Sequence, residues 1–319
     1  MQTIETITSS NSPNIELSPA FLLIAAGGAG KISALAVKKQ HQAACSPFLL
    51  EEIAIDTETD RFDEFDFVIN IAQTQDTVAA MVANPQRYGR ACRAIVENHP
   101  QLLDSETLGH GARTSRPITQ SSFEVHEDLI KKEMREAIHS LLRQGQCRRI
   151  IPVVLASLGG GTGSAAAVLF LDIFMNPLKK SQIVIGLPPD LVARPVLFCV
   201  DPFSHALTQT NDVTPDWILA NSYATRCELA EYEKAGKGYE YVFHIGLGND
   251  SGAIFPTIEQ ACEINGQLCW EWMAGYRRFK ARAVDGLDFY KITSRYLGDD
   301  IPENDIPKEF HPLYAAHID

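Results

Sequence analysis

The sequence lacks any apolar run approaching the roughly 18 to 20 consecutive residues that a membrane-spanning helix needs. Residues 1–18 are polar and rich in Ser, Thr and Asn, without the basic start and apolar centre of a secretion signal. These absences favour a cytoplasmic protein without a membrane span. We interpret residues 1–18 as a disordered arm that precedes the folded part.

An excess of positive charge is also missing. The chain has 28 Lys and Arg against 40 Asp and Glu, which gives a formal net charge of −12. A general nucleic-acid binder needs a basic stripe, so nucleic acid is not expected as a partner. The seven cysteines form no Cys-x-x-Cys pair, and the nine histidines show no metal-ligand spacing. This argues against a zinc ribbon or a redox pair and favours buried, reduced thiols.

What the sequence does contain is a regular alternation of short apolar runs and helical periodicities. The apolar runs that predict strands are 21–26, 52–55, 67–71, 149–156, 196–200 and 241–247. The segments with helical spacing are 31–42, 75–104, 127–144, 165–174, 217–234 and 259–279. This alternation predicts an α/β fold with a doubly wound, mostly parallel sheet, whose ligands lie beyond the carboxyl ends of the strands.

One glycine-rich segment falls at such a strand end, between a predicted strand and a predicted helix. It consists of Gly159, Gly160, Gly161, Thr162, Gly163 and Ser164. Glycines let main-chain N–H groups approach phosphate oxygens, and the helix that follows directs its positive end to the same place. A plain turn rarely needs four glycines in five positions, so we interpret this segment as a phosphate-binding loop.

With the alanine-rich helix that follows it, this loop resembles the signature loop of the tubulin/FtsZ superfamily. Residues 220–229 look more like its divergent bacterial tubulin-like branch than like division-ring FtsZ. The Walker pattern is absent, because Gly30-Lys31 is followed by Ile32. The resemblance covers about residues 20–292. It implies a GTP- or GDP-binding protein with Mg²⁺ at the phosphates, acting as a GTP-dependent switch or an assembly subunit.

The resemblance extends to other loops and implies further ligand contacts. The segment similar to the family's first phosphate loop contains Gly27, Gly28, Ala29, Gly30 and Lys31. The acidic loop near metal and phosphates contains Asp56 and Glu58. The loop that senses the terminal phosphate contains Gly111, Ala112 and Arg113, and the sugar loop contains Asp201. Candidate contacts to the guanine base are Asn221, Asn249 and Asn265.

The sequence departs from the family where hydrolysis is completed. In the family, a loop after the long central helix carries an acid that acts on the next subunit of a filament. Here Asp288 fits that loop, whereas Lys291 stands where the catalytic acid is expected and Gly286 replaces an asparagine. Because a lysine does not polarise water as a carboxylate does, GTP hydrolysis is expected to be weak or to depend on a partner.

The expected organisation is a nucleotide-binding domain over 19–258, the long central helix with its following loop over 259–292, and a short tail over 293–319. The family's second domain is therefore expected to be missing or reduced, which leaves open whether the chain self-associates into filaments or meets another protein partner. Two alternatives remain. An NAD(P)-dependent oxidoreductase is suggested by residues 28–33, a near miss to Gly-x-Gly-x-x-Gly. The other is a nucleotide-binding scaffold without turnover.

Overall fold

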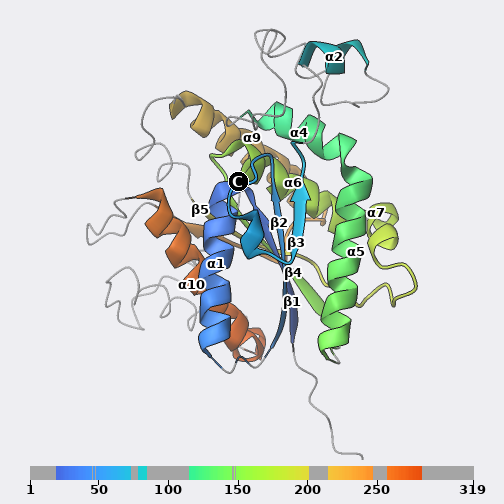
Figure 1. The fold of residues 1–319 in the computed structure, drawn as a ribbon, viewed down its shortest axis with the longest axis vertical. Helices are drawn as coiled ribbons and strands as arrows, with labels where there is room; N and C mark the ends of the chain where they lie inside the picture. Colours follow the sequence, from blue (N-terminus) through green and yellow to red (C-terminus); the bar gives the residue numbers. More distant parts are fainter. Residues whose placement is uncertain are drawn as a thin grey trace, which may run out of the picture.

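A six-stranded, all-parallel sheet forms the centre of the protein (Figure 1). The computed structural model describes residues 19–44, 46, 48–72, 78–84, 115–145, 147, 149–200, 215–246 and 257–281. The strands are β1 (Ala20–Ala26), β2 (Leu49–Asp56), β3 (Phe67–Asn70), β4 (Ile150–Ser157), β5 (Val196–Val200) and β6 (Tyr241–Ile245). Their order in the sheet is β3-β2-β1-β4-β5-β6. The predicted α/β class and the parallel sheet are confirmed.

Helices cover both faces of this sheet. On one face lie α1 (Gly27–Ala43) and α10 (Ile258–Ala281), side by side. On the other face lie α5 (Glu127–Gln144) and α6 (Gly161–Met175). Three further helices pack around α5 and α6, namely α4 (Arg116–Val125), α7 (Pro177–Ile183) and α9 (Pro215–Lys234). Two short elements complete the described part, η1 (Phe62–Glu64) and α2 (Val78–Ala83).

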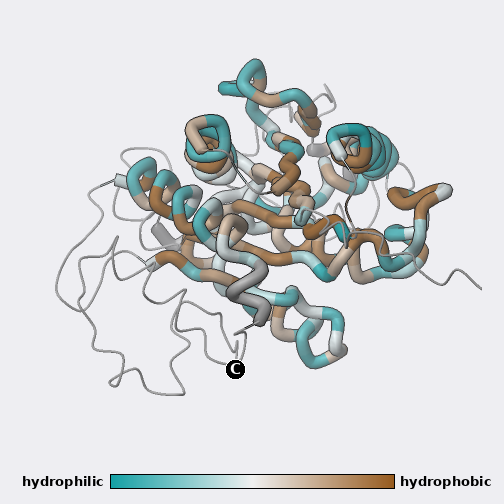
Figure 2. The backbone as a smooth tube through the Cα atoms, turned by 90° about the horizontal axis from the view of Figure 1, so that it is seen from below, coloured by the Kyte–Doolittle hydropathy of each residue, from teal (hydrophilic) through white to brown (hydrophobic). Residues whose placement is uncertain are grey.

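Strands β1, β4 and β5 are buried along their whole length, which explains why their residues are almost all apolar. Along β1, Leu22 and Ile24 pack towards α5 and α6, whereas Phe21, Leu23 and Ala25 pack towards α1 and α10. Figure 2 shows the hydrophobic residues gathered in this central layer and on the helix faces turned towards it. A parallel sheet with helices on both faces requires such strands.

An aromatic cluster fixes α10 on the sheet. The Trp272 ring lies 5.8 Å from Phe21, 5.7 Å from Phe198 and 5.8 Å from Phe243, measured between ring centroids. Tyr276, one turn further along α10, lies 5.3 Å from Trp272. Edge-to-face aromatic pairs each contribute about 0.5–1.5 kcal/mol beyond the area they bury. The position of α10 against β1, β5 and β6 is therefore well determined.

The elements differ from the sequence predictions mainly at helix starts. Helices α1 and α6 begin at Gly27 and Gly161, four residues earlier than expected, because the glycines themselves form the first turns. Helices α4 and α7 were not predicted. Both missed helices carry a proline at their start, a recognised helix-start signal.

The cysteines and helices of the described residues bear on two sequence predictions, namely buried thiols and the absence of a membrane span. Cys199, Cys262 and Cys269 are free and buried as expected, but Cys227 is free and exposed. Among the described helices, none is by itself long and apolar enough to cross a membrane. Helices α6 and α7 reach that length and hydropathy only as a pair bent by 86°, and α6 is buried in the core.

The buried carboxyl group of Glu52 makes the free energy of unfolding depend on pH. Burial raises the pKa of this carboxyl group from 4.5 to about 6, although the Lys38 ammonium 3.0 Å away opposes the shift. The folded protein therefore holds this proton more tightly than the unfolded chain. The stability that Glu52 contributes is present below pH 4.5 and is lost as pH rises through 6, by about 2 kcal/mol.

We expect Glu52→Gln to gain stability relative to the parent protein as pH rises from 4 to 7, because glutamine carries no charge to bury. Urea unfolding at several pH values measures the difference, with Glu240→Gln at an exposed position as the control. A stability difference between Glu52→Gln and the parent that is constant over this range would contradict the prediction.

Candidate functional site

The strand order creates a switch point, at which the connections that follow two neighbouring strands run in opposite directions along the sheet. From β1 the chain winds outward through β2 and β3, and from its neighbour β4 it winds the other way through β5 and β6. Strand β1 runs directly into α1, and β4 runs through residues 158–160 into α6. The starts of α1 and α6 therefore lie next to each other at the carboxyl edge of the sheet. In doubly wound sheets this switch point is where ligands bind.

The main-chain N–H groups at these two helix starts are available to a ligand. Within the described part of the chain, the N–H groups of residues 27–29 and 160–163 have no hydrogen-bond acceptor, because they precede the first intrahelical bond of α1 and α6. Neither helix has a side-chain cap or an acidic residue in its first turn. Unpaired amides and the positive ends of two helix dipoles converge there, so the arrangement stabilises an anion.

The glycines of the two loops fall into two groups. A Cβ atom on Gly30 would collide with the Leu155 carbonyl oxygen, and one on Gly163 would lie 2.6 Å from the Ser157 carbonyl oxygen. Packing of α1 and α6 on β4 thus requires these two glycines. By contrast, a Cβ atom on Gly28 would meet nothing within 4 Å, and one on Gly160 would meet only the Ser157 oxygen at 4.0 Å. Packing does not explain Gly28 and Gly160, whereas close approach of a ligand to the main chain does.

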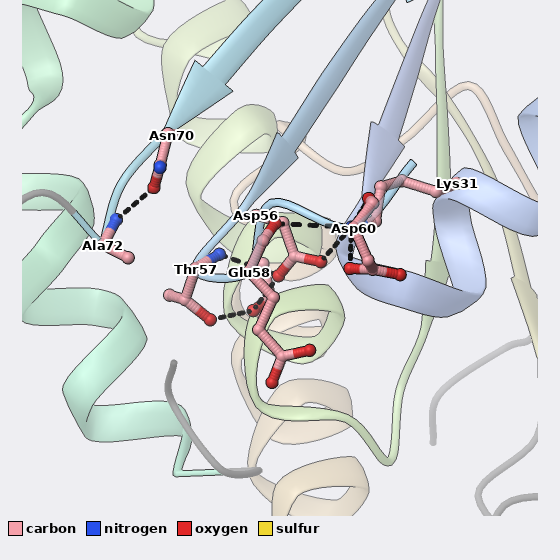
Figure 3. A network of polar contacts seen from close by, with 8 residues as sticks. Lys31, Asp56, Thr57, Glu58, Asp60, Asn70 and Ala72 are labelled. Carbon is pink, nitrogen blue, oxygen red and sulfur yellow. Dashed lines mark hydrogen bonds and ion pairs between the residues drawn. The ribbon is translucent and has the colours of Figure 1, made fainter. Parts of the chain in front are cut away.

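A buried lysine holds the acidic loop after β2 (Figure 3). The Lys31 Nζ atom is 2.9 Å from Asp56 Oδ2, 2.6 Å from Asp60 Oδ1 and 2.7 Å from the Asp60 carbonyl oxygen. It also lies 4.9 Å from the centre of the Phe62 ring, and the Lys31 side chain is fully buried. The expected contact between Lys31 and a phosphate would require these bonds to break. In this structure Lys31 instead connects α1 to the acidic loop after β2 through ion pairs.

Asp56 connects this loop to the start of α6. Its Oδ1 atom accepts hydrogen bonds from Thr162 Oγ1 at 3.0 Å and from the Thr57 N–H at 2.8 Å. With Oδ2 bound to Lys31, both carboxylate oxygens have partners inside the protein, and Asp56 is only 4% exposed. The ends of β2 and β4 are thus joined through one buried carboxylate.

Glu58 is oriented differently from Asp56. Figure 3 shows its side chain pointing away from the cluster of Lys31, Asp56 and Asp60. Among the described residues the Glu58 carboxylate has no ion-pair partner. Burial, together with the negative charges of Asp56 and Asp60, raises its pKa, and Lys31 partly opposes this. Glu58 is therefore the acid of this loop that remains free to meet a cation.

Asn221 and Asn265 are the two predicted base contacts that the structure describes, and they lie in different surroundings. Asn221 Nδ2 donates to the Gly159 carbonyl oxygen at 3.1 Å, so Asn221 does lie beside the glycine loop. Asn265 is fully buried between α10 and α1, where its Nδ2 donates to Ser33 Oγ at 3.2 Å. A base could reach Asn265 only if these helices separated. In this structure Asn265 contributes to helix packing, and its contact with a base stays a prediction.

Comparisons with known proteins identify the fold. Neither a protein-family model nor a curated protein sequence matches the chain. Among solved structures, CetZ2 from Haloferax volcanii is similar with a TM-score of 0.50 and 13% identity, over 80% of this chain and 58% of that chain. The chain has the tubulin/FtsZ fold.

Two other solved structures are similar at lower TM-scores. CetZ from Methanosaeta thermophila is 14% identical with a TM-score of 0.44, over 88% of this chain and 58% of that chain. TubZ of the Clostridium botulinum phage c-st is 13% identical with a TM-score of 0.41, over 82% and 58%. The chain thus spans 58% of the length of each of these three proteins.

The strand order by itself also suits the dinucleotide alternative, because classic dinucleotide-binding sheets have the order 3-2-1-4-5-6. In such proteins an acid near the end of the second strand binds a ribose hydroxyl group. Asp56 occupies that place here, but its two oxygens are bound by Lys31, Thr162 and the Thr57 N–H. The dinucleotide alternative also leaves the second glycine-rich segment, Gly159–Ser164, unexplained.

Several expected site residues lie outside the described residues. These are Gly111, Ala112, Arg113, Asp201, Asn249 and Asp288. The sequence reasoning missed Asp60, which binds Lys31, and Thr225, whose hydroxyl group donates to the Ser164 carbonyl oxygen at 3.1 Å. Thr225 could have been found, because it lies one helical turn after Asn221 on the same face. Among the described residues, no group of three or more His, Cys, Asp or Glu side chains could hold a metal ion.

The division of the glycines predicts two classes of variant. Gly30→Ala and Gly163→Ala should lower the free energy of unfolding by about 1–3 kcal/mol, because the added methyl groups meet main-chain atoms of β4. Gly28→Ala and Gly160→Ala should change it by less than about 1 kcal/mol. Urea unfolding of the four variants tests this, and equal losses in both pairs would refute the distinction.

The buried lysine predicts a coupled pair. Lys31→Met should destabilise the protein by about 3–5 kcal/mol, because it leaves the Asp56 carboxylate buried without its partner. Adding Asp56→Asn should recover part of this loss. Lys234→Met, which breaks an exposed pair with Glu231, should cost less than about 1 kcal/mol. Thermal or urea unfolding measures all three, and additive effects at positions 31 and 56 would count against the pair.

Proposed function

We propose that the chain binds a guanine nucleotide, GTP or GDP, at the adjacent starts of α1 and α6, and that it acts as a nucleotide-dependent switch or assembly subunit. The observation that carries this proposal is the set of acceptor-free N–H groups at residues 27–29 and 160–163. They face the switch point of the sheet, where the main chain is accessible at Gly28 and Gly160.

The distribution of these amides supports a chain of phosphates as the anion. The amides come from two neighbouring loops rather than from one, so a ligand with several negatively charged groups would use both. Thr162 belongs to the same loop, and its hydroxyl group donates to Asp56, which orients the first turn of α6. Main-chain amides of this kind are a common phosphate site in proteins.

The choice of guanine is supported by the similar fold. The Haloferax volcanii CetZ2 structure is of a protofilament with GTPγS bound. Asn221, one of the base contacts expected from the sequence, lies beside the glycine loop, but its amide group bonds the Gly159 carbonyl oxygen and therefore does not support the choice of base. Asn249 stays a prediction for the base, as do Gly111, Ala112 and Arg113 for the terminal phosphate and Asp201 for the sugar.

Magnesium fits the same site. Mg²⁺ prefers oxygen ligands and is usually held by one or two carboxylates together with substrate phosphates. Glu58, whose carboxylate has no ion-pair partner among the described residues, would supply the protein ligand. A bound Mg²⁺ ion would neutralise part of the phosphate charge. Lys31 and Asp56 would keep the loop in position without entering the metal's coordination sphere.

Assembly and hydrolysis follow from the same proposal. The protofilament of CetZ2 supports self-association of this chain in a nucleotide-dependent manner. Asp288 is the residue that we assign to activation of water on a neighbouring subunit. With Lys291 in place of the expected acid, turnover should be slow or should need a protein partner.

Nucleotide binding can be tested directly. We expect purified protein to release GTP or GDP on denaturation, identified by chromatography, and to bind added GTP in calorimetry. Gly28→Val and Gly160→Val should weaken binding by about tenfold or more, because their side chains block approach to the amides. Gly275→Val, at an open glycine of α10, is the matched control.

Three outcomes would refute the proposal. One is the absence of bound and bindable guanine nucleotide. Another is unchanged affinity in both valine variants at positions 28 and 160. The third is release of NAD(P) instead, with a change of nicotinamide fluorescence on binding, which would restore the oxidoreductase alternative.

The role of Glu58 gives a separate prediction. In the parent protein, Mg²⁺ should tighten GTP binding, and Glu58→Gln should reduce this enhancement several-fold, because the amide is a weaker ligand for Mg²⁺. Binding without Mg²⁺ should be unchanged or slightly tighter, since one negative charge near the phosphates is removed. Calorimetry with Mg²⁺ and with EDTA measures both values, and an unchanged Mg²⁺ effect would remove Glu58 from the site.

A further inference from the structure

Side chains of helix α9 contact main-chain carbonyl groups of the glycine loop, residues 159–164. Asn221 Nδ2 donates to the Gly159 oxygen at 3.1 Å, and Thr225 Oγ1, one turn later, lies 3.1 Å from the Ser164 oxygen. Asn221 is 8% exposed and Thr225 is fully buried. These two carbonyl groups flank residues 160–163, whose N–H groups form half of the proposed phosphate site.

The geometry of the peptide bond gives this contact a consequence. A trans peptide is planar, so the N–H group of one residue points opposite to the C=O group of the preceding residue. Since the Gly159 C=O group is directed towards Asn221, the Gly160 N–H group is directed away from α9. That N–H group has no acceptor within the described part of the chain. Asn221 thus fixes the orientation of an amide in the proposed phosphate site.

Thr225 has a single hydroxyl proton, which two carbonyl oxygens share. Its hydroxyl group lies 2.8 Å from the Asn221 carbonyl oxygen, within the same helix, as well as 3.1 Å from the Ser164 oxygen. Helix α9 is itself held from another direction, because Glu228 Oε2 lies 2.7 Å from Nη2 of Arg116, at the start of α4. The loop therefore rests on a helix that is fixed by two neighbours, α6 and α4.

We propose that Asn221 and Thr225 are positioning residues that hold the glycine loop in its phosphate-binding conformation, and that Asn221 does not read the base. This inference rests on the proposed nucleotide site. One N–H bond of the Asn221 amide group is committed to Gly159 at 3.1 Å, and the side chain is almost fully buried, which leaves little of it accessible to a base. Base selection is then the task of other residues.

The test compares ligands that share phosphates and differ in the base. Affinities for GTP, ATP and inorganic tripolyphosphate are measured by calorimetry for the parent protein and for Asn221→Asp. This variant keeps the shape of the side chain, but it loses the donor and places a carboxylate against the Gly159 oxygen. We expect all affinities to fall by a similar factor, roughly tenfold, with the GTP-to-ATP ratio unchanged.

Thr225 provides an independent pair of variants. Thr225→Val removes the hydroxyl group at constant shape and should weaken tripolyphosphate and GTP binding together, by several-fold. Thr225→Ser keeps the hydroxyl group and should restore binding. Tyr223→Phe, at an exposed position on the same helix, is the control and should bind like the parent. Thermal unfolding of each variant sets a temperature at which all of them are folded.

The outcomes separate this inference from the proposed function. A collapse of the GTP-to-ATP ratio in Asn221→Asp, with unchanged tripolyphosphate affinity, would show that Asn221 reads the base and would overturn the inference alone. Unchanged binding of all three ligands in both Asn221→Asp and Thr225→Val would also overturn it. If the parent protein binds GTP and ATP equally but the variants lose both, the positioning role stands and guanine selectivity fails.

Discussion

The close packing of two helices on a single strand determines the rest of the site. Helix α1 crosses the main chain of β4 at Leu155, and α6 crosses it at Ser157, in both cases through a glycine that has no room for a side chain. These approaches bring the first turns of α1 and α6 together at the switch point of the sheet. Convergence of their unpaired amides is therefore a consequence of packing, and no polar side chain is needed to create a site for an anion.

The charged side chains near the starts of α1 and α6 then affect how strongly an anion is stabilised there. The protein is acidic, with a net charge of −12, and the loop after β2 brings Asp56, Glu58 and Asp60 to the same edge. Lys31 offsets part of this charge at the cost of burying an ammonium group. A buried pair of this kind contributes little net stability, and its value lies in fixing geometry. It joins α1, the acidic loop and, through Asp56 and Thr162, the start of α6.

The sequence was informative where the structure depends on local pattern. All six strands could be predicted from short runs rich in apolar residues, and these runs are uninterrupted where the strand is buried throughout, as at 20–26 and 196–200. The starts of α1 and α6 could not, because glycine has low helix propensity and only tertiary packing keeps it helical. The glycines indicated a candidate site at this edge of the sheet, but the partners of Lys31 and Asn265 are distant in sequence, and no spacing rule reveals them.

Helices α10 and α9 are attached to the site in different ways. Helix α10 packs on α1 at Gly266, where a Cβ atom would collide with the Ser33 carbonyl oxygen, and Ser33 also bonds Cys262 and Asn265. Sliding α10 by one residue would bring a side chain against that oxygen, so close main-chain packing fixes α10 on α1. Helix α9 instead contacts the glycine loop through the side chains of Asn221 and Thr225. The orientation of the glycine loop therefore depends on two particular side chains, whereas the position of α10 depends on the absence of one.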